Sequence, residues 1–348
     1  MPQYHWSKYT LQFKRPSGTS RGVLKTKNSW FLIGVDEAFE YPALGECSII
    51  EGLSPDPLNS YEDRLTEVCA WLNGDRAELP DLSAYPSIQF GLEMLQADAA
   101  VKGSKRFFED DFTLGKEQML INGLVWMGDK VWMRSQIDDL IERGFTCIKM
   151  KIGAINFEEE LELLKFIRDE YPADLELRVD ANGAFSADEA LVKLQRLSSY
   201  RLHSIEQPIA VNQWEAMAEL CARSPIPIAL DEELIGRNPS EFGVLLSSIQ
   251  PQYIILKPSL VGGWDASSRW IDTAEALGIG WWMTSALESN VGLNAIAQFT
   301  YQQGVHMPQG LGTGSLYTNN LDSPLYLQGQ KIGFNPTTNW NLSPINHG

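Results

Sequence analysis

The chain has few cysteines, few histidines and no long apolar run, and each shortage excludes a class of protein. The four cysteines lie far apart with no CxxC pair, and the four histidines are equally scattered, which argues against a disulfide framework or a zinc site. No stretch approaches the roughly 20 apolar residues that span a bilayer. Residues 1–16 lack the apolar core of a secretory signal. We therefore expect a cytoplasmic protein without a membrane partner.

Positive charge is also scarce. The 348 residues contain 28 Lys and Arg against 45 Asp and Glu, a net charge of −17 that repels polyphosphates and anionic lipids. Nucleic acid is excluded as an expected partner, whereas a small molecule is not. With 44% hydrophobic residues the chain can form a sizeable core, and its length predicts two domains. The sequence sets no oligomeric state.

Short apolar segments recur about every 24 to 30 residues from residue 120 onward. The stretches between them have helical periodicity, and Asn156 with Glu159 and Ser186 with Glu189 are typical of capped helix starts. Alternating strands and helices predict parallel strands with right-handed crossovers, and eight units predict a closed barrel. An open doubly wound sheet is the competing arrangement, but no glycine-rich phosphate loop follows a first strand. The predicted strands are 121–126, 145–152, 175–180, 203–207, 227–231, 253–257, 280–285 and, more weakly, 306–311.

The first 110 residues have a different pattern, which predicts an α+β domain before a barrel spanning 119–319. The interdomain linker is expected at 102–111. A Gly/Pro-containing turn between two strands is expected at 14–21. The tail, 320–348, lacks the periodicity of a further unit and is expected to pack on the first domain. The expected strands are 9–13, 22–27 and 29–35, and the expected helices are 61–72 and 88–99.

Charged residues end five consecutive predicted strands, where barrel enzymes carry their chemistry. A single acid or lysine there is usually a solvated loop residue or a helix cap, but the three acids follow one another at intervals of 26 and 25 residues. An ion-pair network that closes the barrel is the structural alternative. The residues are Lys149 and Lys151, Asp180, Glu206, Asp231 and Lys257.

The acids and lysines predict different parts of one site. Asp180, Glu206 and Asp231 would converge, and oxygen-only ligands select a hard divalent ion, with Mg²⁺ expected and Mn²⁺ a possible substitute. In a ring of eight strands, Lys151 and Lys257 face each other across the mouth. Amines on both sides of a metal-bound carboxylate indicate removal of its α-proton and stabilisation of an enediolate. We therefore expect a small-molecule carboxylate substrate.

This residue set resembles the enolase superfamily, in its muconate-lactonizing-enzyme-like branch. The resemblance covers nearly the whole chain and implies a modified TIM-type (β/α)7β barrel under an N-terminal α+β capping domain. It implies Lys151 as the acid/base, Lys149 as its electrostatic tuner and Lys257 as the opposing lysine. The three acids become metal ligands, with Glu232 behind them; Asn182 either orders metal-bound water or caps a loop.

Within that branch, segments 257–263, 285–289 and 310–314 most resemble the o-succinylbenzoate synthases. The implied lyase reaction is syn elimination of water from 2-succinyl-6-hydroxy-2,4-cyclohexadiene-1-carboxylate through an enediolate, giving o-succinylbenzoate for menaquinone synthesis. An N-acylamino acid racemase or a related epimerase or cycloisomerase on the same site is the alternative. Dipeptide epimerases are disfavoured because no Asp-x-Asp stands between Val305 and Leu316. A catalytically silent barrel that binds a carboxylate ligand is the rival from another class.

The resemblance also implies substrate contacts. Arg21 would meet the succinyl carboxylate. Backbone N–H groups at Gly262 and Gly263 stand before a helix start and would receive a carboxylate, with close packing of strand and helix as the competing explanation. The remaining candidates for pocket lining are Ser285, Glu288, Gly312 and Thr313.

Overall fold

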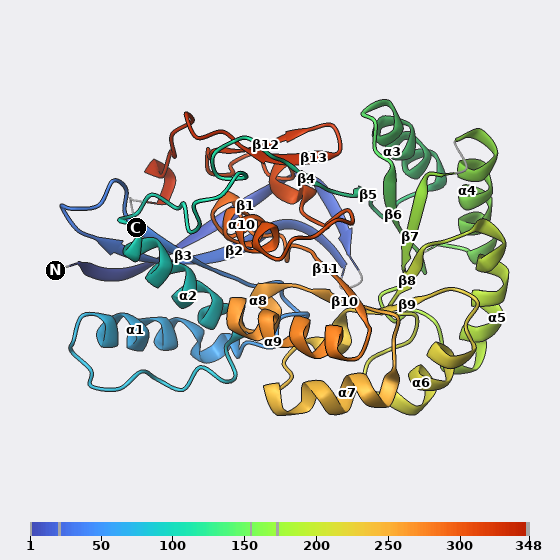
Figure 1. The fold of residues 1–348 in the computed structure, drawn as a ribbon, viewed down its shortest axis with the longest axis horizontal. Helices are drawn as coiled ribbons and strands as arrows, with labels where there is room; N and C mark the ends of the chain where they lie inside the picture. Colours follow the sequence, from blue (N-terminus) through green and yellow to red (C-terminus); the bar gives the residue numbers. More distant parts are fainter. Residues whose placement is uncertain (1, 20–21, 154, 172–173, 346–348) are drawn as a thin grey trace.

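The structure is a computed structural model that describes residues 2–19, 22–153, 155–171 and 174–345. Figure 1 shows an antiparallel sheet with helices beside it on one side of the molecule and a curled parallel sheet surrounded by helices on the other. No helix in these ranges is long and apolar enough to cross a bilayer. The arrangement of the two sheets confirms the predicted α/β architecture with an N-terminal α+β domain.

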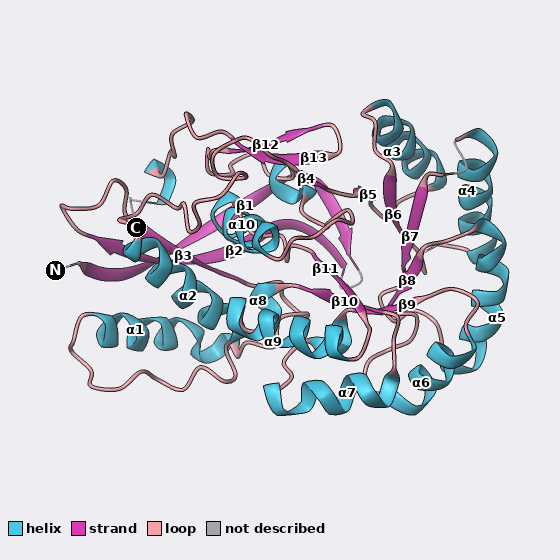
Figure 2. Ribbon diagram, viewed as in Figure 1, coloured by secondary structure: helices cyan, strands magenta, loops and turns pink. Residues whose placement is uncertain are grey.

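The parallel sheet has the strand order β11-β10-β9-β8-β7-β6-β5, so neighbours in the sheet follow one another in the chain (Figure 2). Each strand pairs in parallel with the next, as the predicted crossovers require. The strands are β5 (Gly123–Val125), β6 (Cys147–Lys151), β7 (Glu176–Asp180), β8 (Ser204–Glu206), β9 (Ile228–Leu230), β10 (Tyr253–Leu256) and β11 (Gly280–Met283).

The weak eighth segment, 306–311, forms isolated bridges rather than a strand. Gln309 pairs with Ile121 on one side and Gly310 with Thr284 on the other, so this segment connects the two edges of the curled sheet. Pro308 has no N–H for a ladder, and a glycine such as Gly310 weakens a strand, which accounts for the short pairing. The bridges give the expected (β/α)7β arrangement in its minimal form.

Helices connect the parallel strands and cover the outer face of the sheet (Figure 1). The Ser186 capping box with Glu189 is present, whereas the Asn156 side chain accepts from Glu158 N. The helices of this part are α3 (Lys130–Glu142), α4 (Phe157–Glu170), α5 (Ala187–Leu197), α6 (Trp214–Arg223), α7 (Phe242–Ile249), α8 (Pro258–Val261), α9 (Gly263–Ala276) and α10 (Asn290–Gln302).

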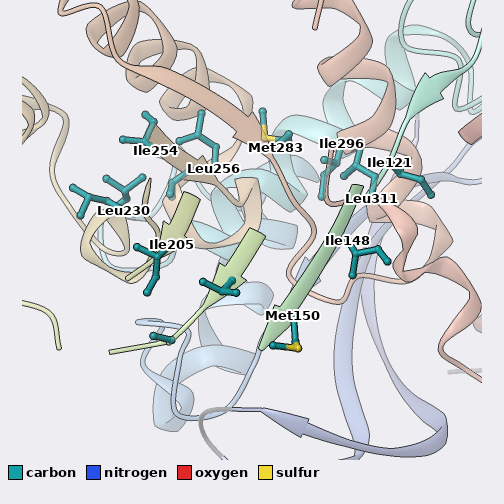
Figure 3. Packing of buried hydrophobic residues seen from close by; sticks show 14 of the residues in the cluster. Ile121, Ile148, Met150, Ile205, Leu230, Ile254, Leu256, Met283, Ile296 and Leu311 are labelled. Carbon is teal, nitrogen blue, oxygen red and sulfur yellow. The ribbon is translucent and has the colours of Figure 1, made fainter. Parts of the chain in front are cut away.

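Side chains that alternate along the strands separate the hydrophobic layer from the barrel interior. Ile148, Met150, Ile205 and Leu256 belong to the main hydrophobic cluster, part of which Figure 3 shows around the strands. Burying one such side chain contributes roughly 1.5 to 3 kcal/mol. The intervening residues point the other way, and this parity directs the strand-end charges to the interior.

The capping domain contains β1 (Gln3–Thr19), β2 (Gly22–Val35) and β3 (Ala43–Ser48) in the antiparallel order β1-β2-β3, with α1 (Tyr61–Leu72) and α2 (Pro86–Ala100). The two strands predicted at 22–27 and 29–35 are one strand, because Asn28 stays in register opposite Thr10. Segment 14–21 was expected to be a turn, but β1 continues to Thr19; residues 20–21 lie outside the described residues.

The segment after α2 and the tail are both anchored by specific contacts. In the segment expected as a linker, Lys105 is buried and its Nζ lies 3.1 Å from Asp98 Oδ2. Tail strands β12 (Leu325–Gln328) and β13 (Lys331–Phe334) form a sheet with β4 (Met119–Leu120), just before the barrel. Arg106 Nη2, within the predicted first domain, donates to Pro336 O in the tail at 2.8 Å. The tail thus contacts both parts, and the domain boundaries remain a prediction.

Candidate active site

The register of the parallel sheet brings the charged strand ends together. Lys151 pairs with Asp180, and Asp180 pairs with Glu206 on the next strand. Asp231 follows β9 directly, and Lys257 follows β10. Side chains in register on neighbouring parallel strands share a face of the sheet, so these five groups meet at the carboxyl end of the barrel.

The acids are buried and bonded to lysines. Asp180 Oδ2 lies 3.0 Å from both Lys149 Nζ and Lys151 Nζ, and Lys149 also contacts the Glu206 carboxylate. Lys257 Nζ contacts Asp231 Oδ2. The three acids are only 1% to 2% exposed. Removing one member of such a buried set leaves an uncompensated charge.

Burial and mutual charge perturb this cluster strongly. Burial and the neighbouring charge of Asp180 raise the pKa of Glu206 to about 8. Burial alone would lower the pKa of Lys149, but the carboxylates of Asp180, Glu206 and Asp231 outweigh it and raise that pKa. Lys257 behaves in the same way, chiefly because of Asp231: its pKa is also raised despite burial. The site therefore strongly favours additional positive charge.

The donor atoms suit a hard divalent ion, although their present contacts are with ammonium groups. Three buried carboxylates provide oxygen ligands of the kind Mg²⁺ takes. Across the described ranges, however, no three Asp, Glu, His or Cys side chains are gathered as they would be around an ion. The ammonium group of Lys149 contacts both Asp180 and Glu206, so these two carboxylates are bridged by a lysine and do not converge on a common point. The chemistry of the donors fits the predicted metal.

A cavity of about 260 Å³ opens beside these charges. Lys149, Lys151, Asp180, Asn182 and Lys257 line it, whereas Glu206 and Asp231 lie behind. Both predicted reacting lysines therefore face one space, although β6 and β10 are separated by three strands of the sheet. The apolar lining includes Ile50 and Leu53 from the capping domain, and Trp126, Leu287 and Leu316 from the barrel.

A hydrogen-bonded chain leads away from Lys151. Lys151 Nζ donates to Asn182 Oδ1 at 2.7 Å, and Asn182 Nδ2 donates to Glu232 Oε1 at 2.8 Å. Glu232 and Asn182 both line the cavity. Asn182 has a φ of +44°, a left-handed conformation that asparagine adopts more readily than most residues. Asn182 thus contacts the lysine itself rather than only capping its loop.

Other predicted substrate contacts divide into two groups. Ser285, Gly312 and Thr313 line the cavity, and the hydroxyl oxygens of Ser285 and Thr313 lie 2.6 Å apart. Glu288 is fully buried and does not line it; its Oε1 accepts from Ser259 Oγ instead. Arg21 lies outside the described residues.

Gly262 and Gly263 favour the packing explanation over carboxylate binding. A Cβ at Gly262 would lie 2.6 Å from Gln89 Oε1, and one at Gly263 would lie 2.2 Å from Glu93 Oε2. The helix start after them already holds a carboxylate, because Trp264 N donates to Glu93 Oε2 at 2.5 Å. That carboxylate comes from the capping-domain helix α2. The sequence identified the anion site but not its occupant.

The capping-domain side of the cavity was missed by sequence reasoning. Ile50 and Leu53 follow β3 in an irregular segment with no periodicity, so nothing local distinguishes them from ordinary core residues. Only the docking of the two domains places them opposite the lysines.

The comparisons with known proteins agree with this geometry. Residues 132–319 match the family model described as enolase C-terminal domain-like. The chain belongs to the enolase superfamily. Within this superfamily, the o-succinylbenzoate synthase of Desulfotalea psychrophila is 45% identical over 93% of this chain and 96% of its own. The N-succinylamino acid racemase of an Amycolatopsis species is 25% identical over 73% and 68%.

Solved structures of superfamily members give the same result. The crystal structure of MenC from Desulfotalea psychrophila superposes with a TM-score of 0.84 at 41% identity, covering 95% of this chain and 99% of that one. The muconate lactonizing enzyme of Pseudomonas putida has a TM-score of 0.76 at 21% identity over 95% and 93%. At that identity, the second likeness concerns the fold alone.

Proposed function

We propose that this chain is a carbon-oxygen lyase that eliminates water from 2-succinyl-6-hydroxy-2,4-cyclohexadiene-1-carboxylate to form o-succinylbenzoate in menaquinone biosynthesis. One observation carries the choice of substrate: the 45% identity to an o-succinylbenzoate synthase over 93% of this chain. The chemistry is supported by Lys151 and Lys257, which line the same cavity.

Lys151 is assigned the proton transfers. As a free amine, Lys151 Nζ takes the proton from the carbon that bears the ring carboxylate, and the electron pair moves into an enediolate. The C–O bond to the ring hydroxyl then breaks, and the Lys151 ammonium returns the proton to the departing oxygen on the same face. The products are water and an aromatic ring, so atoms and charge balance. Asp180 and Asn182, both within hydrogen-bonding distance of Nζ, orient this group.

Lys257 and Lys149 are assigned electrostatic roles. Lys257 lines the cavity as a cation on the opposite side of the curled sheet, where it stabilises the negative charge that develops on the substrate. Lys149 contacts two acids, so it balances buried charge next to Lys151. The apolar residues of the capping domain exclude water above the reacting carbon.

A divalent ion is the expected cofactor of an enzyme of this family, and we propose Mg²⁺, with Mn²⁺ as a substitute. Asp180, Glu206 and Asp231 would hold the ion, and Glu232, which lines the cavity and follows Asp231 in the chain, would support them. Such an ion supplies a positive charge that binds the substrate carboxylate and stabilises the developing anion. The buried oxygen donors of these three carboxylates support this assignment.

The test is a spectrophotometric assay of the cyclohexadiene substrate with Mg²⁺ and with EDTA. Wild type should form o-succinylbenzoate only with metal, and Lys151→Ala should lose at least about 100-fold in kcat, because general acid–base catalysis commonly contributes 10²- to 10⁴-fold. Lys165→Ala, at an exposed helical lysine, is the matched control. No turnover by metal-replete wild type would refute the substrate assignment.

N-acylamino acid racemisation is the second candidate, supported by the two lysines that share the cavity. Incubation with N-succinylamino acids in D₂O separates the reactions. A racemase transfers deuterium to the α-carbon of recovered substrate and needs both lysines as acid and base. The dehydratase needs Lys257 only as a cation, so Lys257→Arg should retain more dehydration than racemisation.

A further inference from the structure

Glu288 follows the last parallel strand but turns into the boundary between the two domains. It is fully buried, and its Oε1 accepts a hydrogen bond from Ser259 Oγ at 2.5 Å. Within the described residues, Glu288 Oε2 has no hydrogen-bond partner. Burial raises the pKa of Glu288. A buried carboxyl with an unpaired oxygen is costly, and Ser259 provides its side-chain hydrogen bond.

Ser259 lies in the turn that carries Lys257. The Lys257 carbonyl accepts from Leu260 N at 2.8 Å and Val261 N at 3.1 Å, and these backbone hydrogen bonds close the turn. The side-chain hydrogen bond from Ser259 to Glu288 ties the same turn to the segment that follows β11. The short helix α8 that follows Lys257 contacts α2 of the capping domain. The direction from which the Lys257 side chain enters the cavity therefore depends on groups that do not line it.

The charges around Glu288 cross the domain boundary. Glu46 in β3 accepts from Ser289 N at 2.8 Å and from Gly292 N at 2.8 Å, so a capping-domain carboxylate caps the barrel helix α10. Lys27 in β2 is 4% exposed and donates to two buried serine hydroxyls. Burial lowers the pKa of Lys27, and the nearby charges of Glu46 and Glu288 oppose that shift, so Lys27 lies close to both acids.

We propose that Ser259 and Glu288 are positioning residues for Lys257. The buried hydrogen bonds of Lys27 and Glu46 hold the capping domain against this part of the barrel. The proposal rests on the proposed function where it concerns catalysis, because it assigns Lys257 a role in that reaction. The placement of Lys257 can be measured without a substrate. The carboxylate of Glu288 itself does not touch the reacting atoms.

The kinetic test removes the hydroxyl of Ser259. Ser259→Ala should lower kcat about 10-fold with less than about a twofold change in KM, because a small misplacement of a charged group affects the transition state most. Ser259→Thr keeps the hydroxyl and should restore most of kcat. Ser267→Ala is the matched control: Ser267 is equally buried, and its Oγ donates to Gly263 O at 2.6 Å within α9.

The second readout is the acylation rate of Lys257, followed by peptide mass spectrometry in the presence of Mg²⁺. Ser259→Ala and Glu288→Ala should each change this rate about fivefold, the equivalent of one hydrogen bond worth about 1 kcal/mol. Glu288→Gln, which still accepts from Ser259, should change it less. The exposed Lys165 in the same digest serves as the internal reference.

The outcomes separate the two proposals. Wild type that fails to turn over the cyclohexadiene substrate, with Lys257 acylation still sensitive to Ser259, would refute the proposed function and support the positioning. Ser259→Ala that matches Ser267→Ala in both kcat and Lys257 acylation would overturn the positioning. If the Ala variants fail to fold, Ser259→Cys keeps the side-chain size and replaces the hydroxyl with a thiol, which is a weak donor to Glu288. A reduced kcat and an altered acylation of Lys257 would then support the positioning, and wild-type values of both would overturn it.

Discussion

Asn182 holds Lys151 on one side and Glu232 on the other, at 2.7 Å and 2.8 Å respectively. It does so with a backbone φ of +44°, so the loop after β7 is bent to aim the amide at the lysine. Strained backbone of this kind is costly and recurs at functional sites. The relationship makes Asn182 the most direct partner of the proposed acid/base besides Asp180.

Replacing Asn182 with Ala should lower kcat about 10- to 100-fold with a smaller effect on KM, because Lys151 loses the acceptor that fixes its direction. Steady-state kinetics with the cyclohexadiene substrate measure both constants. Asn212→Ala is the control, since Asn212 has a φ of +64° and accepts from Arg237 Nη2 at 2.8 Å outside the cavity lining. Equal losses in the two variants would mean that only loop conformation was disturbed.

Glu93 should make stability depend on pH. Burial raises its pKa from 4.5 to about 7. The folded state then binds more protons than the unfolded state, so the free energy of unfolding falls as pH rises from about 4.5 to about 7 and is level beyond this window. A shift of this size is worth about 3 kcal/mol between the two pH values, and Glu93→Gln should abolish this part of the pH dependence. Urea unfolding at several pH values tests it.

The control for this prediction is Glu219→Gln, on an exposed helical face beside Arg223. It should retain the wild-type dependence on pH. A Glu93→Gln protein with the same slope as wild type between these pH values would show that the Glu93 carboxyl titrates normally.

The contact between β3 and α2 should tolerate no side chain at Gly45. A Cβ there would lie 1.7 Å from the carbonyl oxygen of Gly91, and no rotamer relieves a clash with backbone. Gly45→Ala should therefore destabilise the protein by more than about 3 kcal/mol. Because Glu46 is the next residue, a displacement of the backbone at Gly45 should also disturb the contact of Glu46 with α10. Urea unfolding measures the loss of stability.

Gly243→Ala provides the opposite case. Gly243 lies in α7, and nothing stands within 4 Å of the position that an alanine Cβ would occupy there. Helix propensity should make this substitution stabilising by up to about 1 kcal/mol. Similar effects of the two substitutions would contradict the close approach of β3 to α2.

The charged strand ends could be predicted from sequence because strand parity and order are local properties. An apolar run followed by a charge identifies Asp180 and Glu206, and their adjacency follows from consecutive parallel strands. The same reasoning placed Lys151 and Lys257 in one cavity. These positions follow from strand parity and strand order, and depend little on how distant segments pack.

The partners of the more remote residues could not be predicted in this way. Glu93 occupies the helix start after Gly263, although about 170 residues separate it from Trp264. Glu288 does not line the cavity, because its carboxyl accepts from Ser259 and is buried at the boundary with the capping domain. Sequence spacing identifies a site that needs an anion, but only tertiary packing determines which carboxylate reaches it.

Metal binding should itself stabilise the protein. A ligand that binds only the folded state at 100 times its Kd adds about 2.7 kcal/mol, so Mg²⁺ should raise Tm and EDTA should reverse the rise. Glu206→Gln replaces a proposed ligand that is 2% exposed with a neutral amide, and should weaken Mg²⁺ binding in calorimetry at least about 10-fold. Glu189→Gln, at an exposed helical site, should bind as wild type does.

Mn²⁺ should restore both Tm and turnover after EDTA, because it accepts the same oxygen ligands. The two readouts distinguish two explanations of the acidic cluster. If the lysine contacts of Asp180 and Glu206 are only a structural ion-pair network, neither ion changes Tm and Glu206→Gln leaves calorimetric binding unaltered. If the acids hold a metal, the ion must displace the Lys149 ammonium from at least one of them, and Lys149→Met should then bind Mg²⁺ more tightly while losing turnover.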